Sequence, residues 1–213
     1  PGVFSPTLAL PAGQGTVAVV AADLDGDSDL DLASVSFGDS KLTLHIQTSG
    51  VFTREELDAG LFTSSVAAAD LDGDGDMDIV TANRDSNDLT IFIQESPGVF
   101  PATPVVVPDG SNPVSVAAAD LDGDGDMDLV SAGISGNNMT LFFQTSPGSF
   151  TQQPSTLPTG TEPRQVVAAD LDADGDMDLV TANFASENLT LHFQTEAGVF
   201  TASPVALYSG QGC

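Results

Sequence analysis

Positive charge is scarce in this sequence: 4 Lys+Arg stand against 31 Asp+Glu among 213 residues, which gives a formal net charge of −27. Nucleic-acid binding requires a basic surface that neutralises phosphates, and four cationic side chains cannot form one. An anionic membrane surface repels such a chain for the same reason. The sequence therefore predicts neither a nucleic-acid partner nor attraction to an acidic bilayer.

Tryptophan and long apolar runs are missing, and cysteine occurs once. Cys213 is the one cysteine, so no internal disulfide can form. No run of about 18 apolar residues occurs, so we expect no membrane insertion. The absence of an initiator Met and of a signal peptide is typical of a mature or excised piece. With 41% hydrophobic residues and 12 Phe, the chain can nevertheless bury a core, which disfavours disorder.

The acidic residues are concentrated in four nine-residue segments, each with five Asp at alternate positions. These segments hold 20 of the 31 acidic residues and span residues 23–31, 70–78, 120–128 and 170–178. A Gly-x-Phe motif recurs with the same period, at residues 2–4, 50–52, 98–100, 148–150 and 198–200. Self-similarity at a period of about 50 residues indicates a repeat architecture and suits one four-stranded propeller blade.

Each repeat has strand and turn signals only. In the third, an apolar run over Val114–Ala119 leads into the Asp segment, and Met127–Ala132 leaves it. Met139–Thr145 is rich in β-formers, and a further strand at Thr151–Leu157 follows a Pro-Gly turn. The sequence thus predicts an all-β fold: a β-propeller or propeller segment of four-stranded antiparallel blades, with about four blades plus one extra outer strand.

We expect one repeat domain over residues 1–213, consisting of an outer strand at 1–12 and repeats at 13–59, 60–109, 110–159 and 160–213, the last with a C-terminal tail. The extra strand arises because residues 2–10 and 198–207 both qualify as outer strands. Three arrangements remain open: a closed four-bladed ring with a spare strand, half of a larger ring completed by a second chain, and a window of a longer array.

Carboxylates at positions one, three, five, seven and nine of a tight loop predict a site for a hard cation. In such loops alternate carboxylates converge, position seven usually offers its backbone carbonyl, and the last carboxylate can bind bidentately. Ligation by oxygen alone favours Ca²⁺ over soft transition metals. We expect about four Ca²⁺ ions, one per loop, held by Asp23, Asp25, Asp27, Asp29 and Asp31; Asp70, Asp72, Asp74, Asp76 and Asp78; Asp120, Asp122, Asp124, Asp126 and Asp128; and Asp170, Asp172, Asp174, Asp176 and Asp178.

Two loops depart from the pattern without losing a ligand. Ser28 replaces the Gly at position six of the first loop, and Ala173 replaces the Gly at position four of the fourth. Gly at position six allows a sharp turn, so we expect Ser28 to strain its loop and the first site to be the weakest.

The segment Val-Ala-Ala-Ala-Asp-Leu-Asp-Gly-Asp-Gly-Asp-Met-Asp-Leu-Val at residues 116–130 resembles the FG-GAP repeat in its bacterial VCBS-type form. The resemblance covers essentially the whole chain. It implies a propeller blade with a calcium loop between its first two strands, as in the heads of integrin α-subunits, and an extracellular or cell-surface location. The Phe-Gly and Gly-Ala-Pro signatures are absent apart from Phe37-Gly38, so integrin-like partner recognition is not implied.

Strand alternation places the Asp loops on one face of a propeller and the loops between the second and third strands on the other. A protein or glycan partner is expected on the second face, where sequence varies more. Its candidate contact residues share one repeat position: Phe37, Arg84, Ile134 and Phe184. The alternative is that these side chains fold over the blade edges as caps. The loops between repeats add Leu61, Phe62, Glu162 and Arg164.

Catalytic machinery is not evident, because no loop His can activate a nucleophile and most of the carboxylates are committed to metal. We therefore expect no enzyme, but a calcium-binding interaction or structural module of a surface adhesin, filament or secreted assembly. The alternative is a carbohydrate-binding module or the accessory domain of a secreted hydrolase or lyase. Self-association through the terminal strands or Cys213 is a further option, and Asn138 and Asn188 begin formal glycosylation sequons.

Overall fold

The computed structural model describes residues 8–151, 155–201 and 204–208, and it confirms the all-β class. Four antiparallel four-stranded sheets follow one another along the chain. Their strands are β1 (Thr16–Ala22), β2 (Asp31–Ser36), β3 (Lys41–Thr48) and β4 (Val51–Asp58) in blade 1; β5 (Thr63–Ala69), β6 (Asp78–Asn83), β7 (Asp88–Phe92) and β8 (Val105–Pro108) in blade 2; β9 (Pro113–Ala119), β10 (Asp128–Gly133), β11 (Asn138–Phe142) and β14 (Ser155–Pro158) in blade 3; and β15 (Pro163–Ala169), β16 (Asp178–Asn183), β17 (Asn188–His192) and β20 (Val205–Tyr208) in blade 4. Within the described residues, no helix is long and apolar enough to cross a membrane.

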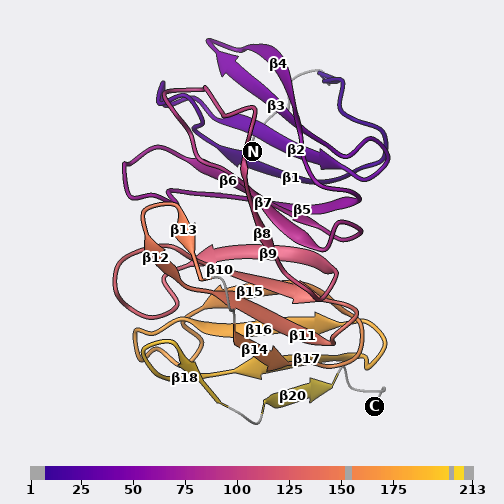
Figure 1. The fold of residues 1–213 in the computed structure, drawn as a ribbon, viewed down its shortest axis with the longest axis vertical. Helices are drawn as coiled ribbons and strands as arrows, with labels where there is room; N and C mark the ends of the chain where they lie inside the picture. The colour runs from indigo at the N-terminus through magenta and orange to yellow at the C-terminus, as the bar shows by residue number, and fades with distance from the viewer. Residues whose placement is uncertain (1–7, 152–154, 202–203, 209–213) are drawn as a thin grey trace, which may run out of the picture.

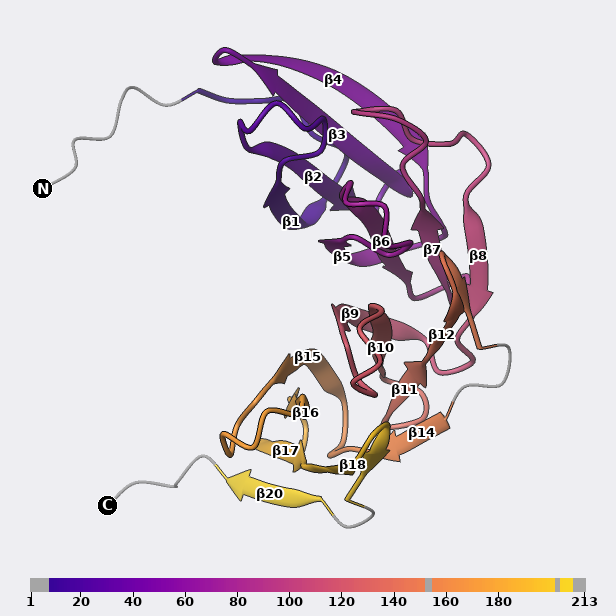
Figure 2. The ribbon, with the colours of Figure 1, turned by 90° about the vertical axis from the view of Figure 1, so that its left-hand side faces the viewer.

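The four blades form an open arc. They follow one another from the indigo to the yellow end of the molecule (Figure 1). The first strands β1, β5, β9 and β15 line the inner side of the arc and pack on one another in chain order, whereas β4, β8 and β14 lie on its outer side (Figure 2). Blades 1 and 4 end the arc on its open side, so the four sheets do not close into a four-bladed ring.

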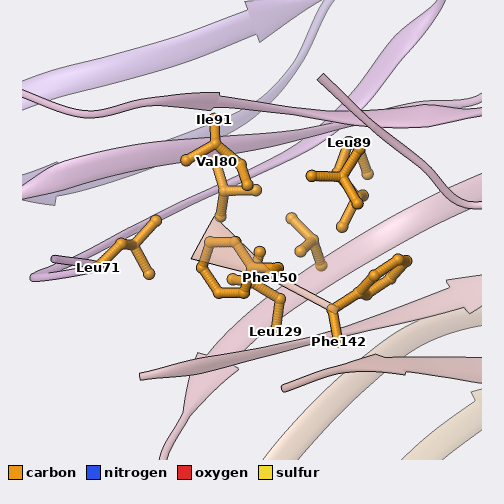
Figure 3. Close-up of a cluster of buried hydrophobic side chains, with 10 residues drawn as sticks. Leu71, Val80, Leu89, Ile91, Leu129, Phe142 and Phe150 are labelled. Atoms are coloured by element: carbon orange, nitrogen blue, oxygen red, sulfur yellow. The ribbon is translucent and has the colours of Figure 1, made fainter. Parts of the chain in front are cut away.

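The hydrophobic core lies between neighbouring blades. Each blade has a forward face, which it turns to the next blade in the chain, and a rear face, which it turns to the preceding one. Figure 3 shows the cluster between blades 2 and 3, where the Phe150 ring lies among side chains of both sheets. Equivalent clusters fill the other two interfaces with Leu24, Leu42, Leu44, Ile79, Phe92 and Phe100 between blades 1 and 2, and with Leu121, Met139, Leu141, Val166, Leu179 and Phe200 between blades 3 and 4.

The third strand of blade 3 is shorter than predicted. Met139–Thr145 is not one strand, because β11 ends at Phe142 and a separate hairpin follows. This hairpin is made of β12 (Gln144–Ser146) and β13 (Ser149–Phe150) in blade 3, and of β18 (Gln194–Glu196) and β19 (Val199–Phe200) in blade 4. We call it the covering hairpin, because it leaves its own sheet and packs on the preceding blade.

The Gly-x-Phe repeat marker is the tip of this hairpin. The Gly98 N–H donates to the Leu24 carbonyl over 3.0 Å, and the Gly148 N–H donates to the Leu71 carbonyl over 3.1 Å. Leu24 and Leu71 are the second residues of the Asp loops of the preceding blades. Burying the accompanying Phe side chain in the preceding interface contributes about 2–3 kcal/mol. The Gly-x-Phe tips of blades 2 and 3 therefore each hold the Asp loop of the blade before them.

The predicted outer strand at residues 1–12 is not a strand over residues 8–12, and residues 1–7 lie outside the described residues. Residues 8–12 instead run along the rear face of blade 1, where the His45 Nε2 atom lies 2.9 Å from the carbonyl oxygen of Pro11. The outer position in blade 4 is held by β20.

Candidate metal sites

The ninth Asp of each loop is buried and holds the loop to the sheet. In blade 2 the Leu71 N–H donates to Asp78 Oδ2 and the Gln94 N–H donates to Asp78 Oδ1, both over 2.7 Å. Asp78 is fully buried and is the first residue of β6. Its carboxylate therefore joins the start of the loop to the end of the third strand. The same two backbone hydrogen bonds recur at Asp31, Asp128 and Asp178.

The other carboxylates shape the loop through hydrogen bonds from its own backbone. The Asp70 carboxylate accepts the N–H of Gly73 over 2.8 Å and that of Gly75 over 3.0 Å. Asp72 and Asp74 each accept the N–H of the residue two positions later. These bonds turn the chain around the carboxylates. Each carboxylate oxygen carries two lone pairs, so one N–H contact leaves it able to bind a cation.

Three carboxylates converge in each loop. Each offers one oxygen, and the three oxygens lie within 4.8 Å of one another in all four loops. The converging groups are Asp23, Asp25 and Asp27 in the first loop, and positions one, three and nine in the others: Asp70, Asp72 and Asp78; Asp120, Asp122 and Asp128; Asp170, Asp172 and Asp178. The side chains at position seven belong to none of these groups, as is expected if this residue offers its carbonyl: Asp29, Asp76, Asp126 and Asp176. Four predicted ligands also lie outside the groups: Asp31 in the first loop, and Asp74, Asp124 and Asp174 at position five of the others.

No basic side chain compensates the loop charge in the described part of the chain. The four Lys and Arg residues pair with acids outside the loops: Lys41 with Asp58, Arg54 with Glu56, Arg84 with Asp85 and Arg164 with Glu162. Four clusters of close carboxylates thus lack a counter-charge and could hold metal ions.

Burial adds to this imbalance. Burial first, and then the nearby loop carboxylates, raise the pKa of Asp78 and of Asp128 to about 6. Burial also raises the pKa of the third-position carboxyls Asp25, Asp72, Asp122 and Asp172. A bound cation would stabilise the ionised form of these groups and reverse the effect.

Ser28 has the strained backbone that the sequence predicts. Its φ is 73°, in the left-handed region, and the equivalent residues Gly75, Gly125 and Gly175 have φ between 96° and 100°. Ala173, at position four, has φ 65°. A side chain in this region costs about 1–2 kcal/mol relative to the right-handed region, and Gly avoids that cost.

Replacing Ser28 by Gly is therefore expected to stabilise the protein by about 1 kcal/mol and to tighten the first metal site. Urea unfolding with and without added calcium measures the first effect, and calcium titration measures the second. Gly50→Ala is the matched control, because Gly50 has φ 81° in an exposed turn with open space around it. It should destabilise by a similar amount without changing calcium affinity. A Ser28→Gly protein no more stable than wild type would contradict the strain argument.

The candidate partner residues do not gather into one ring. Phe37 stacks on Phe62, from the next blade, with ring centroids 5.1 Å apart, and the Arg84 guanidinium lies 4.3 Å from the centroid of Phe62. Phe184 instead lies beneath Arg164, at 5.3 Å. Ile134 is half-buried.

Phe62 is the centre of the first group, and its φ of 54° is an uncommon conformation for a bulky residue. The spacing of the sequence placed Phe62 in a loop between repeats but did not show its contacts, because they cross from one blade to the next. The Phe37–Phe62–Arg84 stack is a partly exposed aromatic and cationic group on the face opposite the Asp loops, in which Phe37 is exposed and Phe62 and Arg84 are half-buried.

Comparison with known proteins identifies the repeat. Residues 23–81, 70–131 and 122–181 each match the FG-GAP-like repeat. Together these matches cover well over half of the chain. The chain belongs to the FG-GAP-like repeat family. Each FG-GAP-like match begins in one Asp loop and extends beyond the start of the next, so the loops are part of the family pattern. No curated protein matches the sequence significantly.

Solved structures similar to this FG-GAP-like chain are β-propellers. A putative 6-phosphogluconolactonase from Bacteroides uniformis has a TM-score of 0.64 at 13% identity, over 92% of this chain and 55% of its own. BBS1N in complex with ARL6DN has a TM-score of 0.60 at 14% identity, over 92% and 57%. A catalytically inactive virginiamycin B lyase from Staphylococcus aureus, bound to quinupristin, has 0.59 at 12%, over 91% and 55%. At these identities the likeness shows the fold alone, and the chain spans little more than half the length of these structures.

Proposed function

We propose that this FG-GAP-like chain is a calcium-stabilised, non-catalytic interaction or structural module that acts outside the cell. One observation carries the proposal: four clusters of converging carboxylates have no basic partner among the described residues. Carboxylate and carbonyl oxygens are the ligands that Ca²⁺ prefers. Extracellular modules commonly bind calcium in the 10⁻⁴–10⁻³ M range, which suits a compartment with roughly millimolar calcium.

The residues present fit such an ion. The three converging carboxylates would hold it, at positions one, three and five in the first loop and at positions one, three and nine in the others, together with the carbonyl at position seven. Bound calcium would neutralise the loop and fix the turn between the first two strands of each blade. Because the ninth Asp also accepts the N–H of the third strand, the ion would tie three strands of a blade together. Its role would be to replace the disulfides that this chain cannot form.

The proposed ligand surface is the face opposite the calcium loops. The Phe37–Phe62–Arg84 stack presents aromatic faces and a guanidinium together, and such groups are enriched where proteins bind partners. A surface adhesin, filament or secreted assembly is the setting we infer from the FG-GAP-like family and from the acidity of the chain.

Calcium titration of the metal-free protein by isothermal calorimetry tests the proposal. We expect about four Ca²⁺ per chain, with Mg²⁺ binding much more weakly because it demands octahedral geometry and gives up its waters reluctantly. Asp70→Ala should reduce the stoichiometry by one ion. The matched control is Asp85→Ala, which removes an exposed carboxylate outside the loops. A protein that binds no calcium at millimolar concentration would refute the proposal.

A glycan array probed in calcium separates the interaction module from the carbohydrate-binding alternative. Glycan binding that chelator abolishes while the β-sheet signal persists would favour the lectin-like function. Arg84→Ala should then weaken that binding if the stack is the ligand surface. Binding that survives this change would place the glycan elsewhere.

A further inference from the structure

Among the blades that the structure describes, none packs against the forward face of blade 4 (Figure 2). Leu171, the second residue of the fourth Asp loop, is 45% exposed, whereas Leu24, Leu71 and Leu121 are fully buried at the same position. Leu189 is 42% exposed, whereas its equivalents in the other blades are fully buried. A hollow on this face is lined by Glu187, Asn188, Leu189 and Tyr208.

The rear face of blade 1 is the complementary half. Val19 is 63% exposed, whereas Val116 and Val166 are buried against the preceding blade. Phe52, at the tip of the β3–β4 turn, is only half-buried, whereas Phe100, Phe150 and Phe200 are buried in the preceding interface. A second hollow lies on this face, lined by Leu10, Ala12, Thr16, Val19, Leu32, Ser34 and His45.

We propose that these two end faces bind each other between copies of this chain, with the Gly50–Phe52 turn of one copy covering Leu171 of the next. The partner is a second copy because the chain already contains this interface three times. Each time, a forward face with its loop Leu meets a rear face with its Val and its Gly-x-Phe tip. The end faces present the same residue types in the same strand positions, so they continue the established packing.

The segment Leu8–Pro11 supports this arrangement. The His45 Nε2 atom contacts the Pro11 carbonyl oxygen over 2.9 Å, as the His192 Nε2 atom contacts that of Pro158 over 2.8 Å. Pro158 ends β14, the outer strand of blade 3, so Pro11 lies where the outer strand of a blade preceding blade 1 would end. In the assembly, Leu8–Pro11 of one copy takes the position beside β17 that β20 holds in the single chain. All four side chains of β20 are exposed, whereas the outer strands β4, β8 and β14 each hold a Leu or Val that is buried or half-buried, so β20 is the most weakly packed of these strands.

The interface is heterologous, because two different faces meet. Two copies close into an eight-bladed ring if the rotation between blades allows it, and a head-to-tail series forms if it does not. Either product uses the same contact. Calcium should be present in the test, since metal-free chains of net charge −27 repel one another.

Analytical ultracentrifugation at about 100 µM chain and about 2 mM calcium tests the interface. We expect species of at least twice the 21.7 kDa chain mass. Leu171→Asp and Phe52→Asp, one on each face, should each lower the association constant by at least about 100-fold while circular dichroism remains native. Val106→Asp is the matched control, because Val106 is 55% exposed on the outer strand β8. It should associate like wild type.

Mixing the two variants gives the deciding result. The Leu171→Asp protein keeps an intact blade 1 face, and the Phe52→Asp protein keeps an intact blade 4 face, so the mixture should form a pair that neither forms alone. A wild-type chain that stays monomeric under these conditions would overturn the inference. If the two variants are natively folded by circular dichroism and stay monomeric when mixed, the inference is also overturned. Calcium stoichiometry measured on the same samples separates a failure of this interface from a failure of metal binding.

Discussion

Chelation of calcium is expected to lower the thermal midpoint of this protein by at least about 20 °C. In about 10 mM calcium, a site with a dissociation constant of about 10⁻⁴ M is at 100 times that constant and contributes about 2.7 kcal/mol to the free energy of unfolding, so four such sites contribute roughly 11 kcal/mol. This equals the whole stability of many domains, about 5–15 kcal/mol. For a chain of this size each kcal/mol moves the midpoint by about 2–4 °C.

The metal-free fold carries a specific penalty besides the loss of binding energy. Burial raises the pKa of Asp78 and Asp128 to about 6, compared with 3.8 for an exposed carboxyl. Between these two values the folded state holds more protons than the unfolded state, so stability falls as the pH rises from about 4 to about 6. At neutral pH the metal-free protein therefore bears the full cost of these buried charges.

Differential scanning calorimetry in calcium, in magnesium and in EDTA measures this effect. Magnesium serves as the control for ionic strength and divalent charge, and it should restore only a small part of the stability. Equal midpoints in calcium and in EDTA would contradict the proposed role of the loops.

The Asp loops and the blade fold could be predicted because their signals are local. Alternate Asp residues at positions 120–128 and strand patterns on either side lie within one repeat, and both recur with a fixed period. The open arc could not be predicted in this way, since closure depends on the angle between whole blades. The role of the Gly-x-Phe marker could not be predicted either, because it depends on a contact between two blades. Its period was visible, but its role as a tip that holds the preceding loop depends on the contact of Gly148 with Leu71, 77 residues away.

The ninth position of the loop differs most from its predicted role. Asp78 was expected as a metal ligand alone, and the structure shows that it is also the acceptor for two backbone N–H groups. The sequence carries little sign of this, because all five Asp of a loop look alike. Only their different burial separates them: Asp78 is fully buried, whereas Asp74 is exposed.

Asp78→Ala is therefore expected to destabilise the calcium-bound protein by about 4 kcal/mol, far more than Asp76→Ala. The Ala variant leaves the N–H groups of Leu71 and Gln94 without an acceptor, at about 1–3 kcal/mol each. It also weakens the second calcium site. Asp76→Ala is the matched control, because it keeps the backbone carbonyl and no hydrogen bond from its side chain is part of the loop network.

Asp78→Asn separates the two roles of this carboxylate. Asn keeps one acceptor oxygen and removes the buried charge, but its amide nitrogen faces an N–H donor. In calcium we expect Asp78→Asn to lose stability through the weakened metal site. In EDTA no metal is lost, and the free energy gained by removing a buried charge offsets much of the free energy lost with one hydrogen bond. The variant should therefore unfold at nearly the same urea concentration as wild type. Asp78→Ala should remain destabilised in both buffers, because it lacks both acceptors. If Asp78→Ala and Asp76→Ala unfolded alike, the buried carboxylate would not be the link between the calcium loop and the sheet.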